Sequence, residues 1–248
     1  MTDAAAQTIR KTYPNARTTD ETVTRLLAIM SAELGLAPHQ IMHADSICCD
    51  DLNAIEYPKA AYDMLGPFKL GGLNGFPFAG LTGMGAFAHH VPEGGAVFVF
   101  HAPHIGITSA GGVGESLRPG QPTASACCGA ARAALARLER GDIAPGAIDE
   151  LDYQQTTLEQ ILLQSKERIL GAQNRIVAVT DVIYEAIERR IDLLAARTKY
   201  PCPHLVIMGG VLINGDHDVG SFCDARRFVH VNTATGERTD WYSKLEPA

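Results

Sequence analysis

The sequence has no excess of positive charge. Its 21 Lys and Arg residues are outnumbered by 28 Asp and Glu residues, so the formal net charge is −7, and no run of basic residues occurs along the chain. Proteins that bind nucleic acid neutralise phosphates with clustered Lys and Arg. Nucleic acid is therefore not an expected partner.

Long apolar segments are also missing. No stretch reaches the roughly 18 consecutive apolar residues that a membrane-spanning helix needs, and residues 1–10 contain no basic start followed by an apolar stretch. We therefore expect a cytoplasmic protein with no membrane partner. Hydrophobic residues make up 46% and charged residues 20% of the 248 residues, which is typical of a folded globular protein.

The six cysteines do not form the C-x-x-C pattern of compact metal or redox sites, and H-E-x-x-H is absent as well. Four of the cysteines form the adjacent pairs Cys48-Cys49 and Cys127-Cys128, whereas Cys202 and Cys223 are isolated. Adjacent cysteines rarely bridge each other, because disulfide geometry strains such a pair. Metal or redox chemistry therefore explains these residues better than a disulfide framework.

Two short apolar runs predict strands buried on both faces, at residues 96–100 and 205–213. Helical patterns lie between them, at residues 126–139 and from about Thr157 to Arg197. Buried strands separated by amphipathic helices predict an α/β fold with a mainly parallel central sheet flanked by helices.

A capping box at Thr18-Thr19-Asp20-Glu21 predicts a helix that Gly35 and Pro38 end. This helix precedes every candidate site residue. We therefore divide the chain into an N-terminal helical appendage, residues 1–40, which packs on the core or on a second subunit, and a single α/β domain, residues 41–248.

Glycine and phenylalanine alternate through residues 65–90. This composition indicates close approach of the backbone around an apolar pocket, with Phe76, Phe78 and Phe87 as candidate walls. A tightly packed loop without a ligand explains the same composition. His89 and His90 at the end of this segment either transfer protons, since imidazole titrates near neutral pH, or cap the turn at Pro92.

Three potential metal ligands follow or begin predicted elements. Cys48 lies where an apolar step meets acidic residues, His104 follows the first buried strand, and Cys128 starts the small-residue stretch Gly129-Ala130-Ala131 of the predicted helix. Two thiolates and one imidazole suit zinc and leave a fourth position for water or substrate. Buried cysteines are more often small hydrophobic residues, so spacing alone leaves both interpretations open. The other candidates, Cys202-Pro203-His204, His217 and Cys223, have no companion ligands at suitable spacing.

Five motifs occur in the order found in the limiting-CO2-inducible protein B family, which the chain resembles from about Ile41 to near the C-terminus. They are Cys48-Cys49-Asp50-Asp51-Leu52-Asn53, Gly71-Gly72-Leu73-Asn74-Gly75-Phe76-Pro77-Phe78, Ala88-His89-His90-Val91-Pro92, Ala102-Pro103-His104-Ile105-Gly106 and Cys127-Cys128-Gly129-Ala130. The run Met208-Gly209-Gly210-Val211-Leu212-Ile213-Asn214 resembles that family's late strand.

The resemblance implies a fold like that of β-carbonic anhydrases, a homodimer, and a Zn2+ ion held by Cys48, His104 and Cys128. It also implies that Asp50, two positions after the first cysteine, takes part in catalysis. Cys49 and Cys127 offer alternative registers for the ligands. The expected function is a zinc-dependent carbonic anhydrase (carbonate dehydratase, a lyase), which interconverts carbon dioxide and bicarbonate by attack of zinc-bound hydroxide.

One departure from the β-carbonic anhydrase pattern C-x-D-x-R bears on activity, because Leu52 occupies the arginine position. An unrestrained Asp50 can itself take the fourth zinc position. Arg118 is a candidate substitute, and Lys59 or an arginine of a partner subunit competes with it. The alternatives are therefore an inactive zinc-binding homologue that acts as a binding or regulatory subunit and, third, a zinc hydrolase of another small electrophile such as carbonyl sulfide.

Overall fold

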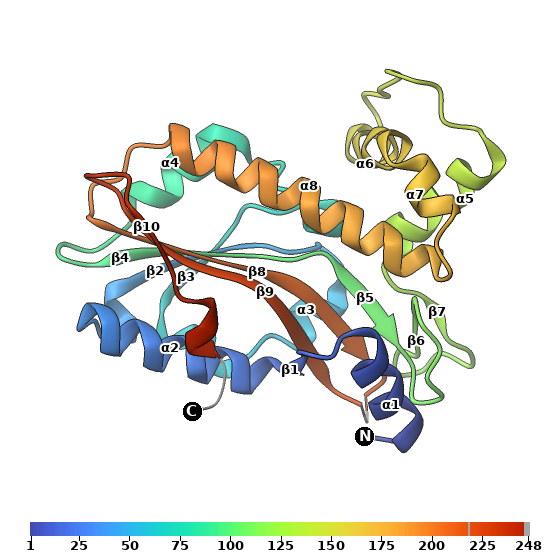
Figure 1. The fold of residues 1–248 in the computed structure, drawn as a ribbon, viewed down its shortest axis with the longest axis horizontal. Coiled ribbons are helices and arrows are strands. Elements are labelled where there is room, and N and C mark those ends of the chain that lie inside the picture. The colour runs from blue at the N-terminus through green and yellow to red at the C-terminus, as the bar shows by residue number, and fades with distance from the viewer. Residues whose placement is uncertain (218, 246–248) are drawn as a thin grey trace.

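A mixed sheet forms the centre of the computed structural model, which describes residues 1–217 and 219–245 (Figure 1). Its strand order is β1-β9-β8-β4-β2-β3, with β10 added to β9 and β5 added to β8. The strands are β1 Arg17–Thr18, β2 Ile41–Ser46, β3 Leu65–Lys69, β4 Ala96–His101, β5 His104–Ile107, β8 His204–Gly215, β9 Ser221–Asn232 and β10 Arg238–Asp240. A separate two-stranded sheet pairs β6, Glu115–Ser116, with β7, Ser125–Ala126.

The predicted mainly parallel sheet is confirmed. Strands β3, β2, β4 and β8 run parallel to one another, and β5 is parallel to β8. Strand β9 is antiparallel to β8. The sequence pattern of residues 221–232 did not predict a strand there. The reason is its charge: Arg226 and Arg227 interrupt any apolar run, and they are accommodated because Arg226 pairs with Asp181 and Arg227 with Asp192, both on α8.

Helices cover both faces of the sheet (Figure 1). Helix α8 and α4 lie on one face and α2 on the other, while α5, α6 and α7 gather beyond the end of α8. The helices are α1 Asp3–Thr12, α2 Thr19–Leu34, α3 Asp51–Ile55, α4 Gly80–His89, α5 Gly129–Arg140, α6 Tyr153–Gln164, α7 Lys166–Leu170 and α8 Arg175–Arg197, with short 3-10 turns η1 Pro38–Gln40, η2 Lys59–Asp63, η3 Leu73–Gly75 and η4 Tyr242–Leu245.

The segment predicted as one long helical region, from about Thr157 to Arg197, contains three helices. Breaks occur at Ser165 and at Gly171, and α8 restarts where the Asn174 side chain accepts a hydrogen bond from the Val177 backbone N–H. No helix in the described part of the chain has both the length and the apolar character that crossing a bilayer requires.

The N-terminal segment packs on the core. Leu26 and Met30 of α2 are buried against Phe98 and Val206 of the sheet, and β1 pairs with β9. Gly35 ends α2 in the left-handed conformation, with φ of 68°, which glycine adopts without steric cost. The capping box is present: the Thr18 hydroxyl accepts from the Glu21 N–H and the Glu21 carboxylate accepts from the Thr18 N–H, each at 3.2 Å.

Replacing the cap should weaken this packing measurably. We expect Thr18→Ala to lower the free energy of unfolding by about 1 kcal/mol, because the first turn of α2 loses a partner for an otherwise unpaired N–H. Urea denaturation measures the difference. Thr24→Ala, at an exposed position in the same helix, is the matched control and should have almost no effect. Equal stability of the two variants would contradict the capping argument.

Candidate metal centre

Three buried side chains from separate elements meet at the carboxyl end of the parallel strands. Cys48 follows β2, His104 begins β5 and Cys128 is the N-cap of α5. Their exposed fractions are 5%, 1% and 3%, and their potential ligand atoms all lie within 4.8 Å of one another. The two sulfurs are 3.9 Å apart.

The donor atoms fit a zinc ion. In the described part of the chain, Nε2 of His104 is buried and has no hydrogen-bond partner, whereas Nδ1 lies 2.7 Å from Oδ1 of Asn214. A buried nitrogen without a partner is costly unless it binds something. Two sulfurs and one imidazole nitrogen are a ligand set that zinc accepts, and they leave a fourth tetrahedral position. Their role as zinc ligands stays a prediction.

The glycine-rich loop reaches this cluster. The Asn74 N–H donates a hydrogen bond to Sγ of Cys48 at 3.1 Å, which stabilises negative charge on the sulfur. A Cβ atom on Gly75 would lie 2.3 Å from the Ala102 carbonyl oxygen, and one on Gly71 would lie 2.3 Å from that of Ile47. Both positions therefore require glycine. The predicted close backbone approach is present, and it brings the Asn74 N–H to the Cys48 sulfur.

Phe87 does not line a pocket in this loop. Its side chain is fully buried in the hydrophobic core, where its ring lies 6.0 Å from that of Phe68. Phe76 and Phe78 contact each other, with ring centroids 5.0 Å apart. The Gln154 side chain of α6 accepts a hydrogen bond from the Leu73 N–H at 2.8 Å. Of the three predicted pocket walls, Phe87 therefore belongs to the hydrophobic core, and Phe76 and Phe78 pack on each other.

Contacts within the cluster shift the pKa values of Cys48 and His104. Contact with Cys128 and burial raise the pKa of the Cys48 thiol to about 12, because adjacent thiolates out of water would repel each other. Burial lowers the pKa of His104, but its interactions with the Cys127 and Cys48 sulfurs outweigh burial and raise it well above its ordinary value. A divalent cation bound here would replace these protons, because it would supply the charge that stabilises thiolates.

Asp50 follows Cys48 by two residues and contacts an arginine from a distant loop. Its Oδ1 accepts hydrogen bonds from Nη2 of Arg118 at 2.8 Å and from the Leu52 N–H at 3.1 Å. Arg118 is 19% exposed and also pairs with Asp51 at 3.2 Å. Leu52, in the position where β-carbonic anhydrases carry arginine, is buried in the structure. Tertiary structure thus places Arg118 against Asp50, while Lys59 is exposed on η2.

In each adjacent cysteine pair, only one cysteine belongs to the cluster. Cys49 is exposed, whereas Cys48 belongs to the cluster. Cys127 is buried, but its sulfur contacts Nδ1 of His104 at 3.6 Å, on the side of the ring away from Nε2. Cys128 is therefore the member of the second pair that joins the cluster.

The remaining candidates lie elsewhere. Cys202 contacts the carbonyl oxygen of His204, whose ring contacts that of His230 at 3.0 Å. His217 is exposed and Cys223 is buried in the sheet.

His89 and His90 do not adjoin the cluster. They are exposed at the end of α4, which leads to the amino end of β4, whereas the cluster lies at the carboxyl end. A six-residue strand separates these edges by about 20 Å. This placement does not support a direct proton shuttle.

Two polar residues near the cluster were not predicted as site residues, namely Asn74 and Asn214. Both occur inside the family-like motifs, but a motif does not say which of its side chains contacts which ligand. Asn74 donates from its backbone, and Asn214 is separated from His104 by 110 residues in sequence. Only the fold brings these groups together.

Residues 16–232 match the family of limiting CO2-inducible proteins B/C β-carbonic anhydrases. The chain is similar to the crystal structure of PtLCIB4, a homolog of the limiting CO2-inducible protein LCIB, with a TM-score of 0.83 and 26% identity over 96% of this chain and 99% of that one. LCIB itself gives a TM-score of 0.71 at 22% identity, covering 93% of this chain and 95% of LCIB, and supports the fold alone. No curated protein sequence matches the chain.

Proposed function

The chain belongs to the limiting CO2-inducible proteins B/C β-carbonic anhydrase family, and from this premise we propose that it is a zinc-dependent carbonic anhydrase that interconverts carbon dioxide and bicarbonate. Cys48, His104 and Cys128 would hold the ion. Zinc in a site with three protein ligands lowers the pKa of a bound water to about 7 and thereby supplies hydroxide at neutral pH. We also propose that the protein is a homodimer, as the family resemblance implies.

The protein's own residues would orient the reactants. Asp50 would accept a hydrogen bond from the nucleophile and orient it toward the carbon of carbon dioxide, which is a positioning role. Arg118 keeps the Asp50 carboxylate in place. The Asn74 N–H stabilises the Cys48 thiolate.

The observation that carries this proposal is the contact between Arg118 and Asp50 at 2.8 Å. Carboxylate oxygen is an acceptable zinc ligand, so a free Asp50 would compete with water for the fourth position. The arginine and the Leu52 N–H together occupy Oδ1 of Asp50. They therefore favour an open metal site, which catalysis requires.

A second candidate is a zinc-binding protein without activity, acting as a binding or regulatory subunit. The observation that favours it is the divided pairing of Arg118, which also contacts the exposed carboxylate of Asp51. An arginine shared in this way holds Asp50 less firmly than a dedicated partner would.

Stopped-flow hydration of carbon dioxide, with zinc content measured on the same sample, tests the proposal. Stoichiometric zinc with hydration well above the buffer rate is the expected result. Zinc without hydration would favour the inactive homologue, and a purified protein that cannot bind added zinc would overturn both. Light scattering after size-exclusion chromatography tests the homodimer.

Zinc affinity should depend steeply on pH. The raised pKa of Cys48, about 12, means that its thiol must release a proton to bind the ion. Protons compete with zinc, so affinity falls as pH falls, by at least about tenfold per pH unit between about pH 8 and about pH 6. Competition with a chelator of known affinity measures it. Cys49→Ser should show the same slope, and an affinity independent of pH would contradict thiolate ligation.

A further inference from the structure

Hydrogen bonds continue from His104 away from the cluster. Nδ1 of His104 lies 2.7 Å from Oδ1 of Asn214, and Nδ2 of Asn214 donates to Oε2 of Glu56 at 3.3 Å. His104 and Asn214 are each 1% exposed. Strands β5 and β8 pair side by side in a fixed parallel register, which holds the imidazole and the amide together.

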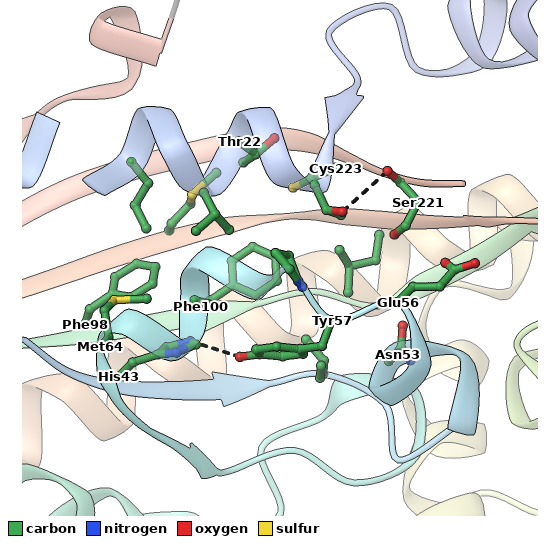
Figure 2. A pocket seen from close by; sticks show the side chains of 18 of the residues that line it. Thr22, His43, Asn53, Glu56, Tyr57, Met64, Phe98, Phe100, Ser221 and Cys223 are labelled. Carbon is green, nitrogen blue, oxygen red and sulfur yellow. Dashed lines mark hydrogen bonds between the residues drawn. The ribbon is translucent and has the colours of Figure 1, made fainter. Parts of the chain in front are cut away.

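Glu56, the last group in this series of hydrogen bonds, lines a cavity between α2 and the sheet. Asn214 also lines this cavity. Figure 2 shows Glu56 and Asn53 at one end of the cavity, with His43 and Phe98 at the other. Glu56 is only partly buried, so its side chain can be shortened without leaving an enclosed hole.

The direction of each hydrogen bond follows from the chemistry of the three groups. An ionised carboxylate only accepts, so Glu56 requires the Nδ2 end of the Asn214 amide. The Oδ1 end then faces His104 and can only accept, which requires the proton of the imidazole to lie on Nδ1. In the neutral imidazole that binds a metal, Nε2 would thereby be left with its lone pair directed into the cluster.

We propose that Asn214 and Glu56 are positioning residues that select the metal-binding tautomer of His104 and fix the orientation of its ring. Glu56 acts through Asn214, since it sets which end of the amide faces the imidazole. Cys127 completes the surroundings, with its sulfur 4.0 Å from Oδ1 of Asn214, where its S–H is a weak donor. This proposal rests on the proposed metal site and is independent of whether the protein hydrates carbon dioxide.

A double-mutant cycle on zinc affinity tests it. Chelator competition gives the zinc dissociation constants of the native chain, Asn214→Leu, Glu56→Ala and the double variant. We expect Asn214→Leu to weaken binding by about 10-fold to 100-fold, the usual effect of losing an outer partner of a metal-binding histidine. Glu56→Ala should weaken it less. The double variant should bind no more weakly than Asn214→Leu, because Glu56 has no route to His104 without the amide.

Controls separate positioning from general destabilisation. Thr22→Val changes a residue that lines the same cavity but donates only to the Thr18 carbonyl oxygen, and it should leave affinity unchanged. Glu56→Gln keeps an oxygen that can accept from Asn214 and should restore part of the affinity lost in Glu56→Ala. In NMR spectra of the zinc-loaded protein, the Nδ1 proton of His104 should be protected from exchange and should lose this protection in Asn214→Leu.

Native affinity in Asn214→Leu, or additive losses in the double variant, would overturn the proposal. If Asn214→Leu does not fold, equal affinities of Glu56→Ala and the native chain would do so as well. A native chain that binds no zinc would instead overturn the proposed function. The measurements therefore distinguish failure of the proposed function from failure of the positioning role.

Discussion

His104→Ala and Cys128→Ala are each expected to weaken zinc binding by more than about a hundredfold, which exceeds the usual loss from removing an outer partner. The reason is the small number of ligands. Each of these side chains supplies one of three donor atoms from separate elements, so its loss leaves only two ligands. Zinc content after exhaustive dialysis and chelator competition measure the effect, and hydration of carbon dioxide should fall to the buffer rate with it.

Cys49→Ser is the matched control for the cysteine variants, since Cys49 is adjacent to a predicted ligand but exposed. It should retain zinc. Cys127→Ser should also retain zinc, because the Cys127 sulfur faces Nδ1 of His104 and not the cluster. Unchanged zinc affinity in both His104→Ala and Cys128→Ala would show that the ion binds elsewhere, and loss of zinc only in Cys49→Ser or Cys127→Ser would select the other register.

Arg118→Ala is expected to reduce kcat/KM for hydration by about a hundredfold while zinc stays bound. Without the guanidinium, Asp50 retains only the Leu52 N–H as a partner for Oδ1 and is free to turn toward the ion. A carboxylate in the fourth position would add a ligand and exclude water, so zinc affinity should stay constant or rise while activity falls. This opposite change in binding and activity is the signature of a closed site.

Asp51→Asn provides the control for Arg118. It removes the charge of the second carboxylate that shares the guanidinium but leaves the contact with Asp50 in place, so activity should be preserved. Arg118→Lys should recover activity only in part, because an ammonium group cannot reproduce the several directed contacts of the guanidinium. Full activity in Arg118→Ala would mean that another group restrains Asp50, and simultaneous loss of zinc would mean that Arg118 maintains the site's structure.

Local sequence patterns were sufficient to predict two central strands and one covering helix of the fold. The apolar runs at 96–100 and 205–213 correspond to β4 and β8, and the capping box with Gly35 corresponds to the ends of α2. Patterns failed where long-range partners compensate an unfavourable local composition. Strand β9 contains two arginines that pair with carboxylates of α8, and β3 lies within a glycine-rich segment whose pairing comes from β2.

The sequence by itself determined that this protein is an α/β member of its family with two cysteines and one histidine available as metal ligands, because those signals lie in short contiguous motifs. Tertiary structure alone decided how the site is completed. Arg118 meets Asp50 across 68 residues, Asn214 meets His104 across 110, and the choice between Cys127 and Cys128 depends on which sulfur the turn into α5 directs toward Cys48. These contacts join side chains that no local pattern relates, so only the packing of the strands and loops brings them within bonding distance.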